Sequence, residues 1–286
     1  MPKPGAAARG RLLVVGTPIG NLGDLTPRAA DALLTADLVV AEDTRLAQRL
    51  LAHLGERRPT SAFNEHNAEE RLSGLLARLA AGETLALTTD AGMPGVSDPG
   101  ARLVAAARAT GVPVEVLPGP SAVTAAVALA GVEATGFVFG GFLPTRPAAA
   151  RAAALERLVA SAGGLGLPLV LFEAPHRTTA LLTALERVAP ASRVAACREL
   201  TKLHEQVVIG TPAEVRAALP EPRGEFTLVI SDLAAPAPAV GQGLDPKAIA
   251  AAARAAGLSD RSTVDLLRAA GVGHREAYRL VMTEKG

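Results

Sequence analysis

The chain has 286 residues, 49% of them hydrophobic, and its 29 Lys and Arg nearly balance its 28 Asp and Glu. This length and apolar content can bury a large core, which excludes a chain that is disordered over most of its length. A single cysteine and the lack of a Cys/His cluster at zinc spacing exclude a disulfide scaffold and a structural zinc module.

A reducing cytoplasm is therefore the expected location. The N-terminal residues show no signal-peptide pattern, and the most apolar stretch, 122–132, is far shorter than the ~20 residues of a membrane span. We expect a cytoplasmic protein without a membrane partner.

The first 120 residues alternate short apolar runs with helical patterns. Buried strands are predicted at 12–15, 38–41, 84–88 and 114–117. Thr26 before Pro27 and Asp98 before Pro99 are typical helix starts, and Asn67 followed by Glu70 has capping-box spacing. The pattern predicts a parallel α/β domain over residues 11–119.

The second half has a different order of elements. Strands are predicted near 137–142, 169–172, 194–198, 205–209 and 226–231, with room for only a short helix at Thr211-Pro212 between the last ones. We therefore expect a mixed sheet with antiparallel pairs in a second α/β domain, 120–232. A Pro/Ala/Gly-rich linker (233–244) and a small helical C-terminal module (245–286) follow.

Two glycine-containing loops follow predicted strands of the first domain. Glycines 16, 20 and 23 permit close backbone approach, but their spacing does not match the dinucleotide fingerprint, and a plain tight turn stays equally possible. The loop 88–100 places Asp90 and free amides at the sheet edge where open α/β sheets bind ligands. Asp98 has a capping role there, whereas Asp90 is favoured as a ligand-binding residue.

Polar side chains also follow other predicted strands. Glu42, Asp43 and Arg45 suit either a ribose contact or a helix cap with a surface ion pair. His66 follows the next extended segment, although an isolated histidine is more often structural or merely exposed. The segments 172–177 and 198–202 place charges that could line an interdomain cleft.

Nine ordered motifs resemble the tetrapyrrole-methylase superfamily: TPIGNLGDLT (17–26), AEDTR (41–45), NEHN (64–67), TDAGMPGVSDPG (89–100), LPGPSA (117–122), GFLP (141–144), FEAPHR (172–177), RELTKLHE (198–205) and GEFTLVI (224–230). The resemblance runs from about Arg11 to Ser231. Met93 departs from the family, which usually has Thr in that loop.

The resemblance implies a two-domain tetrapyrrole-methylase-like fold, a homodimer, and S-adenosyl-L-methionine bound in the cleft between the two α/β domains. Within the superfamily, the motifs resemble those of enzymes that methylate the 2′-hydroxyl of a cytidine ribose. The resemblance therefore implies 16S rRNA or the small ribosomal subunit as partner. By motif, the cofactor would be surrounded by Pro18, Asp90, Gly92, Met93, Pro94, Ser121, Ala122, Phe172, Glu225, Phe226 and Thr227.

A ribose hydroxyl is a weak nucleophile, so a general base or a polarising cation is expected beside it. No metal is predicted. The candidates on the acceptor side are Glu42, Asp43, Arg45, His66 and Lys202. Arg45, beside Asp43, is expected to fix the nucleotide, because an arginine fork suits phosphate. The ordinary pKa of His66, ~6.5, suits it best as the base near neutral pH.

The C-terminal module resembles a helix-turn-helix, with His274, Arg275, Tyr278 and Arg279 on one exposed face. This arrangement favours nucleic acid as partner, with a small helical cap as the alternative. Two other functions stay open: a superfamily relative acting on a porphyrin or a protein, and a non-catalytic nucleic-acid-binding regulator.

Overall fold

The structure is a computed structural model that describes residues 10–220, 222–235 and 246–282. The chain divides into two compact units, residues 1–235 and 236–286. The first unit contains two five-stranded sheets, which we call the first lobe (10–120) and the second lobe (121–235). No helix in the described part of the chain is both long and apolar enough to cross a membrane.

The first-lobe sheet has the order β3-β2-β4-β1-β5, and every neighbouring pair is parallel. Its strands are β1 (Arg11–Val15), β2 (Leu38–Ala41), β3 (Thr60–Ala62), β4 (Thr84–Leu87) and β5 (Val114–Leu117). Strands β1, β2 and β4 are almost entirely buried because helices cover both faces of the sheet. The predicted parallel sheet is confirmed.

Helices α1 (Pro27–Thr35) and α2 (Thr44–His53) pack on one side of this sheet, and α3 (Ala68–Ala80) and α4 (Gly100–Ala109) pack on the other. The chain after β1 leads to α1 and the chain after the neighbouring β4 leads to α4, so these two loops diverge to opposite faces. A crevice between diverging loops at the carboxyl ends of parallel strands is where such sheets bind ligands.

Local helix starts agree with the sequence except at two points. The Thr26 hydroxyl accepts from the Ala29 amide at the start of α1, as predicted. The capping box at Asn67 is wrong, because its side chain accepts from the Asn64 amide instead of capping α3. The helix start expected at Asp98-Pro99 is also wrong: α4 begins at Gly100, with Pro99 as its N-cap, and the Asp98 carboxylate accepts from the amides of Gly95 and Gly100.

The second-lobe sheet has the order β6-β7-β10-β8-β9. Only β6 and β7 pair in parallel, while the other neighbours are antiparallel, which confirms the mixed sheet. The strands are β6 (Val138–Phe142), β7 (Leu169–Glu173), β8 (Arg193–Arg198), β9 (Gln206–Gly210) and β10 (Phe226–Ser231).

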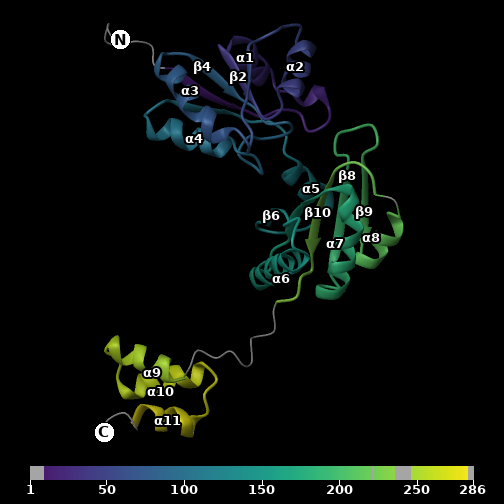
Figure 1. Ribbon diagram of the computed structural model, residues 1–286. Helices are drawn as coiled ribbons and strands as arrows, with labels where there is room; N and C mark the ends of the chain where they lie inside the picture. The colour runs from purple at the N-terminus through teal and green to yellow at the C-terminus, as the bar shows by residue number, and fades with distance from the viewer. Residues whose placement is uncertain (1–9, 221, 236–245, 283–286) are drawn as a thin grey trace. The chain divides into compact units, whose positions relative to one another are not determined.

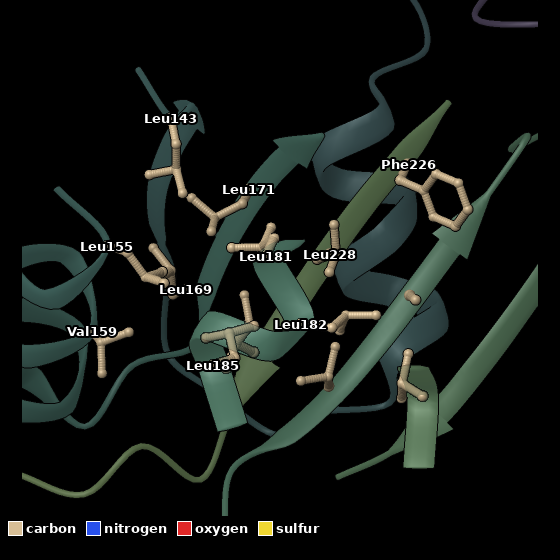
Figure 2. Packing of buried hydrophobic residues seen from close by; sticks show 14 of the residues in the cluster. Leu143, Leu155, Val159, Leu169, Leu171, Leu181, Leu182, Leu185, Phe226 and Leu228 are labelled. Carbon is tan, nitrogen blue, oxygen red and sulfur yellow. The ribbon is translucent and has the colours of Figure 1, made fainter. Parts of the chain in front are cut away.

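Helices cover both faces of this sheet as well. Helices α6 (Ala148–Leu165), α7 (Pro175–Val188) and α8 (Pro212–Ala218) enclose the leucine-rich core of one face (Figure 2). Helix α5 (Ala122–Ala130) packs on the opposite face, and Ile19 from the first lobe joins that cluster. The two lobes therefore share apolar contacts.

The second unit is a bundle of three short helices, α9 (Pro246–Ala255), α10 (Asp260–Ala269) and α11 (His274–Met282) (Figure 1). Its own small core contains Ala250, Val264, Leu267, Ala277 and Val281. Most of the linker expected at 233–244 lies outside the described residues.

Candidate functional site

The loops that follow β1 and β4 are tied together at the carboxyl edge of the first sheet. The Thr17 amide donates to the Gly92 carbonyl at 2.9 Å, and the Gly92 amide donates back to the Thr17 carbonyl at 3.1 Å. A Cβ on Gly16 would lie 2.6 Å from both the Gly119 amide nitrogen and the Met93 sulfur. Glycine is needed at position 16 because three chain segments meet there.

A cleft of about 450 Å³ lies beside these loops and takes its wall from both lobes. Its volume falls within the ~300–1,000 Å³ of small-molecule sites. The lining residues are Ile19, Glu42, Thr89, Asp90, Ala91, Gly92, Met93, Val96, Ser97, Ser121, Ala122, Phe142, Phe172, Glu173, Ala174, Pro175, Cys197, Leu200, Glu225, Phe226 and Thr227.

Two carboxylates from the first lobe line this cleft. The Thr89 hydroxyl donates to Glu42 at 3.1 Å, and the Asp43 amide donates to Asp90 at 2.9 Å. Burial and the neighbouring Asp90 carboxylate raise the pKa of Glu42. Burial also raises the pKa of Asp90, and this effect outweighs the hydrogen bond from the Asp43 amide, which lowers that pKa. This wall is rich in negative charge and suits a cationic ligand.

Aromatic side chains form part of the second-lobe wall. Phe172 at the end of β7 contacts Phe139 edge-on, with ring centroids 5.1 Å apart, and Phe142 in a tilted arrangement at 5.4 Å. Phe142 is 53% exposed, so an apolar or aromatic ligand in the cleft would cover it. Burial raises the pKa of the Cys197 thiol to about 11, so the thiol is uncharged at neutral pH.

The structure brings nine of the eleven residues predicted for the cofactor to this cleft, all except Pro18 and Pro94. Pro18 lines a second cavity of about 290 Å³, which we call the side pocket. The side pocket is lined by Thr17, Pro18, Leu22, Leu33, Val39, Leu46, Ala47, Arg49, Leu50, Thr88, Thr89 and Asp90.

Of the residues predicted for the acceptor, only Glu42 lines the cleft. Asp43 and Arg45 form a forked ion pair at the start of α2, where hydrogen bonds from Arg45 lower the pKa of Asp43 to about 2. Arg45 itself is 85% exposed. His66 is exposed in the loop after β3, and its amide donates to the Asn64 side chain.

Lys202 lies behind the cleft wall. Its ammonium donates to Glu199 and Glu225, each at 3.0 Å. Burial lowers the pKa of Lys202, but the hydrogen bonds to Glu225 and Glu199 outweigh it and the pKa is raised. Lys202 therefore keeps its proton and holds Glu225 at the cleft. A Cβ on Gly20 would lie 2.5 Å from Lys202 Cγ, so glycine lets the lobes approach here.

Sequence reasoning did not select Glu173, which the structure shows to be the most buried carboxylate of the cleft wall. Its side chain has no exposed surface and is paired with Arg151 of α6 and Arg177 of α7. The motif 172–177 marked this strand end, but Arg151 lies over twenty residues earlier in an Ala-rich helix. Only the packing of α6 against β7 brings that partner to Glu173.

The exposed face predicted for the second unit is present. His274, Arg275, Tyr278 and Arg279 are all exposed on α11. Among the residues that the structure describes, no group of three or more His, Cys, Asp or Glu side chains is placed to hold a metal ion.

The two sheets and the cleft at their edges define a class of two-lobed α/β proteins with a small-molecule cleft between the lobes. Residues 11–216 match the family described as Tetrapyrrole (Corrin/Porphyrin) Methylases. The chain belongs to this methylase family.

Similar proteins include two named "Ribosomal RNA small subunit methyltransferase I". The one from Xylella fastidiosa (strain Temecula1) is 43% identical over 79% of this chain and 82% of that protein. The one from Thermotoga maritima is 39% identical over 78% of this chain and 98% of that protein.

Solved structures show the same fold. The uroporphyrin-III C-methyl transferase of Thermus thermophilus, complexed with S-adenyl homocysteine, has a TM-score of 0.58 at 23% identity. The match covers 78% of this chain and 98% of that one.

Proposed function

We propose that this protein transfers a methyl group from S-adenosyl-L-methionine to the 2′-hydroxyl of a cytidine ribose in small-subunit (16S) ribosomal RNA. The observation that carries the proposal is the cleft, which gathers nine of the residues expected for the donor in a chain 43% identical to a ribosomal RNA small subunit methyltransferase. The resemblance of its sequence motifs supports the cytidine 2′-hydroxyl as acceptor.

The residues of the cleft fit the methyl donor. Its volume of about 450 Å³ suits one nucleoside-sized ligand, and Phe142 and Phe172 offer aromatic surface for an adenine ring. The carboxylates of Asp90 and Glu42 complement the positive charge of a sulfonium. S-adenosylmethionine supplies the methyl group when bound, and the chain's own residues hold and orient it.

Glu42 is the residue best placed to accept the proton of the ribose hydroxyl. It lines the cleft, accepts from Thr89, and burial beside Asp90 raises its pKa toward the range of a useful base. The low pKa of Asp43 makes it a weak base, and Lys202 is held protonated by its carboxylate partners.

Asp43, Arg45 and His66 lie outside the cleft wall, at the carboxyl edge of the first sheet. We assign Arg45 to a phosphate of the acceptor strand, because an exposed guanidinium fork suits phosphate oxygens. His66 stays the alternative base, provided that the bound RNA brings its ring toward the hydroxyl.

The protein would act in the cytoplasm as a homodimer, as the family resemblance implies. The edge strand β5 exposes Val116 with 57% of its surface accessible, which supports a partner at this edge. The basic face of α11 supports a contact between the second unit and RNA.

The test is mass mapping of methylated ribonucleosides after incubation with S-adenosylmethionine and either small ribosomal subunits or free 16S rRNA. We expect one new 2′-O-methylcytidine that depends on the protein. Methylation of an added porphyrin, with RNA unchanged, would refute this proposal and show that the protein methylates a tetrapyrrole.

The base is identified by single-turnover rates of Glu42→Gln and His66→Ala with saturating donor. We expect a loss of roughly 10²–10⁴-fold for Glu42→Gln and a rate near that of the unaltered protein for His66→Ala. The opposite pattern would assign the base to His66.

A further inference from the structure

The side pocket lies next to the cleft at the carboxyl edge of the first sheet. Thr89 and Asp90 line both cavities, so the two cavities adjoin at these residues. The side pocket measures about 290 Å³, at the lower end of small-molecule sites, which suits a single small ring.

The inner wall of the side pocket is aliphatic. Leu33 of α1, Val39 of β2 and Leu50 of α2 are buried, while Leu22 is 45% exposed and Leu46 is 37% exposed. Enzymes that take a nucleotide out of its stack commonly hold the base between apolar side chains. Leu22 and Leu46 are the exposed side chains that such a base would cover.

Apart from Arg49, the polar side chains of the wall offer oxygen atoms. The Thr17 hydroxyl can donate its proton to the Thr89 carbonyl at 3.3 Å or to the Gly92 carbonyl at 3.4 Å, and the Thr88 hydroxyl donates to the Val40 carbonyl. The Thr89 hydroxyl donates to Glu42. Because each hydroxyl has only one proton, these oxygens can offer a ligand only their lone pairs.

A wall of acceptors selects a ring that carries a hydrogen-bond donor. The exocyclic amine of cytosine is such a donor, whereas uracil presents a carbonyl oxygen at the same place. Arg49 is exposed and lines the side pocket, so its positively charged guanidinium could bind the phosphate of a nucleotide whose base enters the pocket.

We propose that the side pocket holds the cytosine base of the acceptor nucleotide, so that its ribose lies at Thr89 and Asp90 where the two cavities adjoin. This inference rests on the proposed function. A base that stays stacked in a duplex cannot enter this pocket, so the acceptor must leave its stack. The side pocket then sets both the position of the hydroxyl and the choice of base.

The first experiment fills the side pocket. Ala47 of α2 is 8% exposed and lines it, whereas Ala52 of the same helix is exposed and lines neither cavity. We expect Ala47→Phe to lower kcat/KM for the ribosomal substrate at least tenfold, while calorimetry shows a donor affinity within about twofold of the unaltered protein. Ala52→Phe should change neither quantity.

Normal methylation by a folded Ala47→Phe protein would overturn the inference. Absence of methylation by the unaltered protein would instead refute the proposed function, so the two failures are distinct. Equal loss of donor binding and of kcat/KM in Ala47→Phe would also count against a separate base pocket.

The second experiment uses the unaltered protein, so it does not depend on a variant that folds. Cytidine 5′-monophosphate and uridine 5′-monophosphate are titrated by methyl NMR with S-adenosyl-L-homocysteine present. We expect cytidine 5′-monophosphate to shift the methyl signals of Leu33, Val39 and Leu50, and the uridine nucleotide to do so at higher concentration. Shifts by neither nucleotide, or equal shifts by both, would overturn the assignment of a cytosine-selective pocket.

Discussion

Replacing Asp90 by asparagine removes one negative charge from the cleft and keeps most of its shape. The asparagine Oδ1 can still accept from the Asp43 amide, as Asp90 Oδ1 does at 2.9 Å. S-adenosylmethionine carries a positive sulfonium, whereas S-adenosylhomocysteine has a neutral sulfur. The substitution should therefore weaken binding of the first ligand much more than binding of the second.

The size of the cleft sets the expected magnitude. A cavity of about 450 Å³ has the volume of a sphere of roughly 5 Å radius, so a wall carboxylate lies about that far from a central charge. Their attraction is ~3 kcal/mol at an effective dielectric constant of about 20 and ~1 kcal/mol when water screens it. Because Asp90 is exposed and water screens its charge, we expect a loss near the lower of these values, roughly 1 kcal/mol, or about 5-fold in affinity.

Isothermal titration calorimetry of both ligands with the unaltered protein and with Asp90→Asn measures this difference. Asp98→Asn is a useful comparison, because that carboxylate does not line the cleft and accepts from loop amides. Equal losses for both ligands in Asp90→Asn would refute the electrostatic argument and leave Asp90 with a role in shape alone.

Three further predictions follow from other contacts. Since the pKa values of Asp90 and Glu42 lie above their ordinary 3.8 and 4.5, both carboxyls are neutral at low pH and become charged as pH rises through the raised values. The preference for S-adenosylmethionine over S-adenosylhomocysteine should thus increase as pH rises through these raised pKa values, and a flat ratio in calorimetry would contradict this. Glu173→Gln leaves two largely buried guanidinium groups without their carboxylate and should lower the free energy of unfolding by roughly 3–5 kcal/mol in urea denaturation. The more exposed pair of Arg78 and Glu83 provides the control, because Glu83→Gln should cost under ~1 kcal/mol. Removal of residues 246–286 should weaken RNA binding and flatten its salt dependence while donor affinity stays the same; unchanged RNA affinity would favour a purely structural role for these helices.

The sequence by itself determined most of the strands and helices. It also indicated the strand ends at which the residues of the candidate site lie. Apolar runs predicted most of the strands, because a strand buried on both faces has few polar positions. Local chemistry also predicted the Thr26 cap of α1 and the short helix after Thr211. The capping box at Asn67 failed because the same side chain found a competing partner in the loop before the helix.

Only the tertiary structure decided which polar residues share a wall. Glu42 and His66 each follow one of two neighbouring strands, so the sequence does not distinguish their positions. In the structure Glu42 lines the cleft, whereas His66 is exposed. One partner of Glu173, Arg151, and one partner of Lys202, Glu225, come from distant segments. The side pocket forms where α1, α2, strand β2 and the loops after β1 and β4 meet. Periodicity reports which face of an element is buried, but distances between loops depend on how helices pack across the sheet.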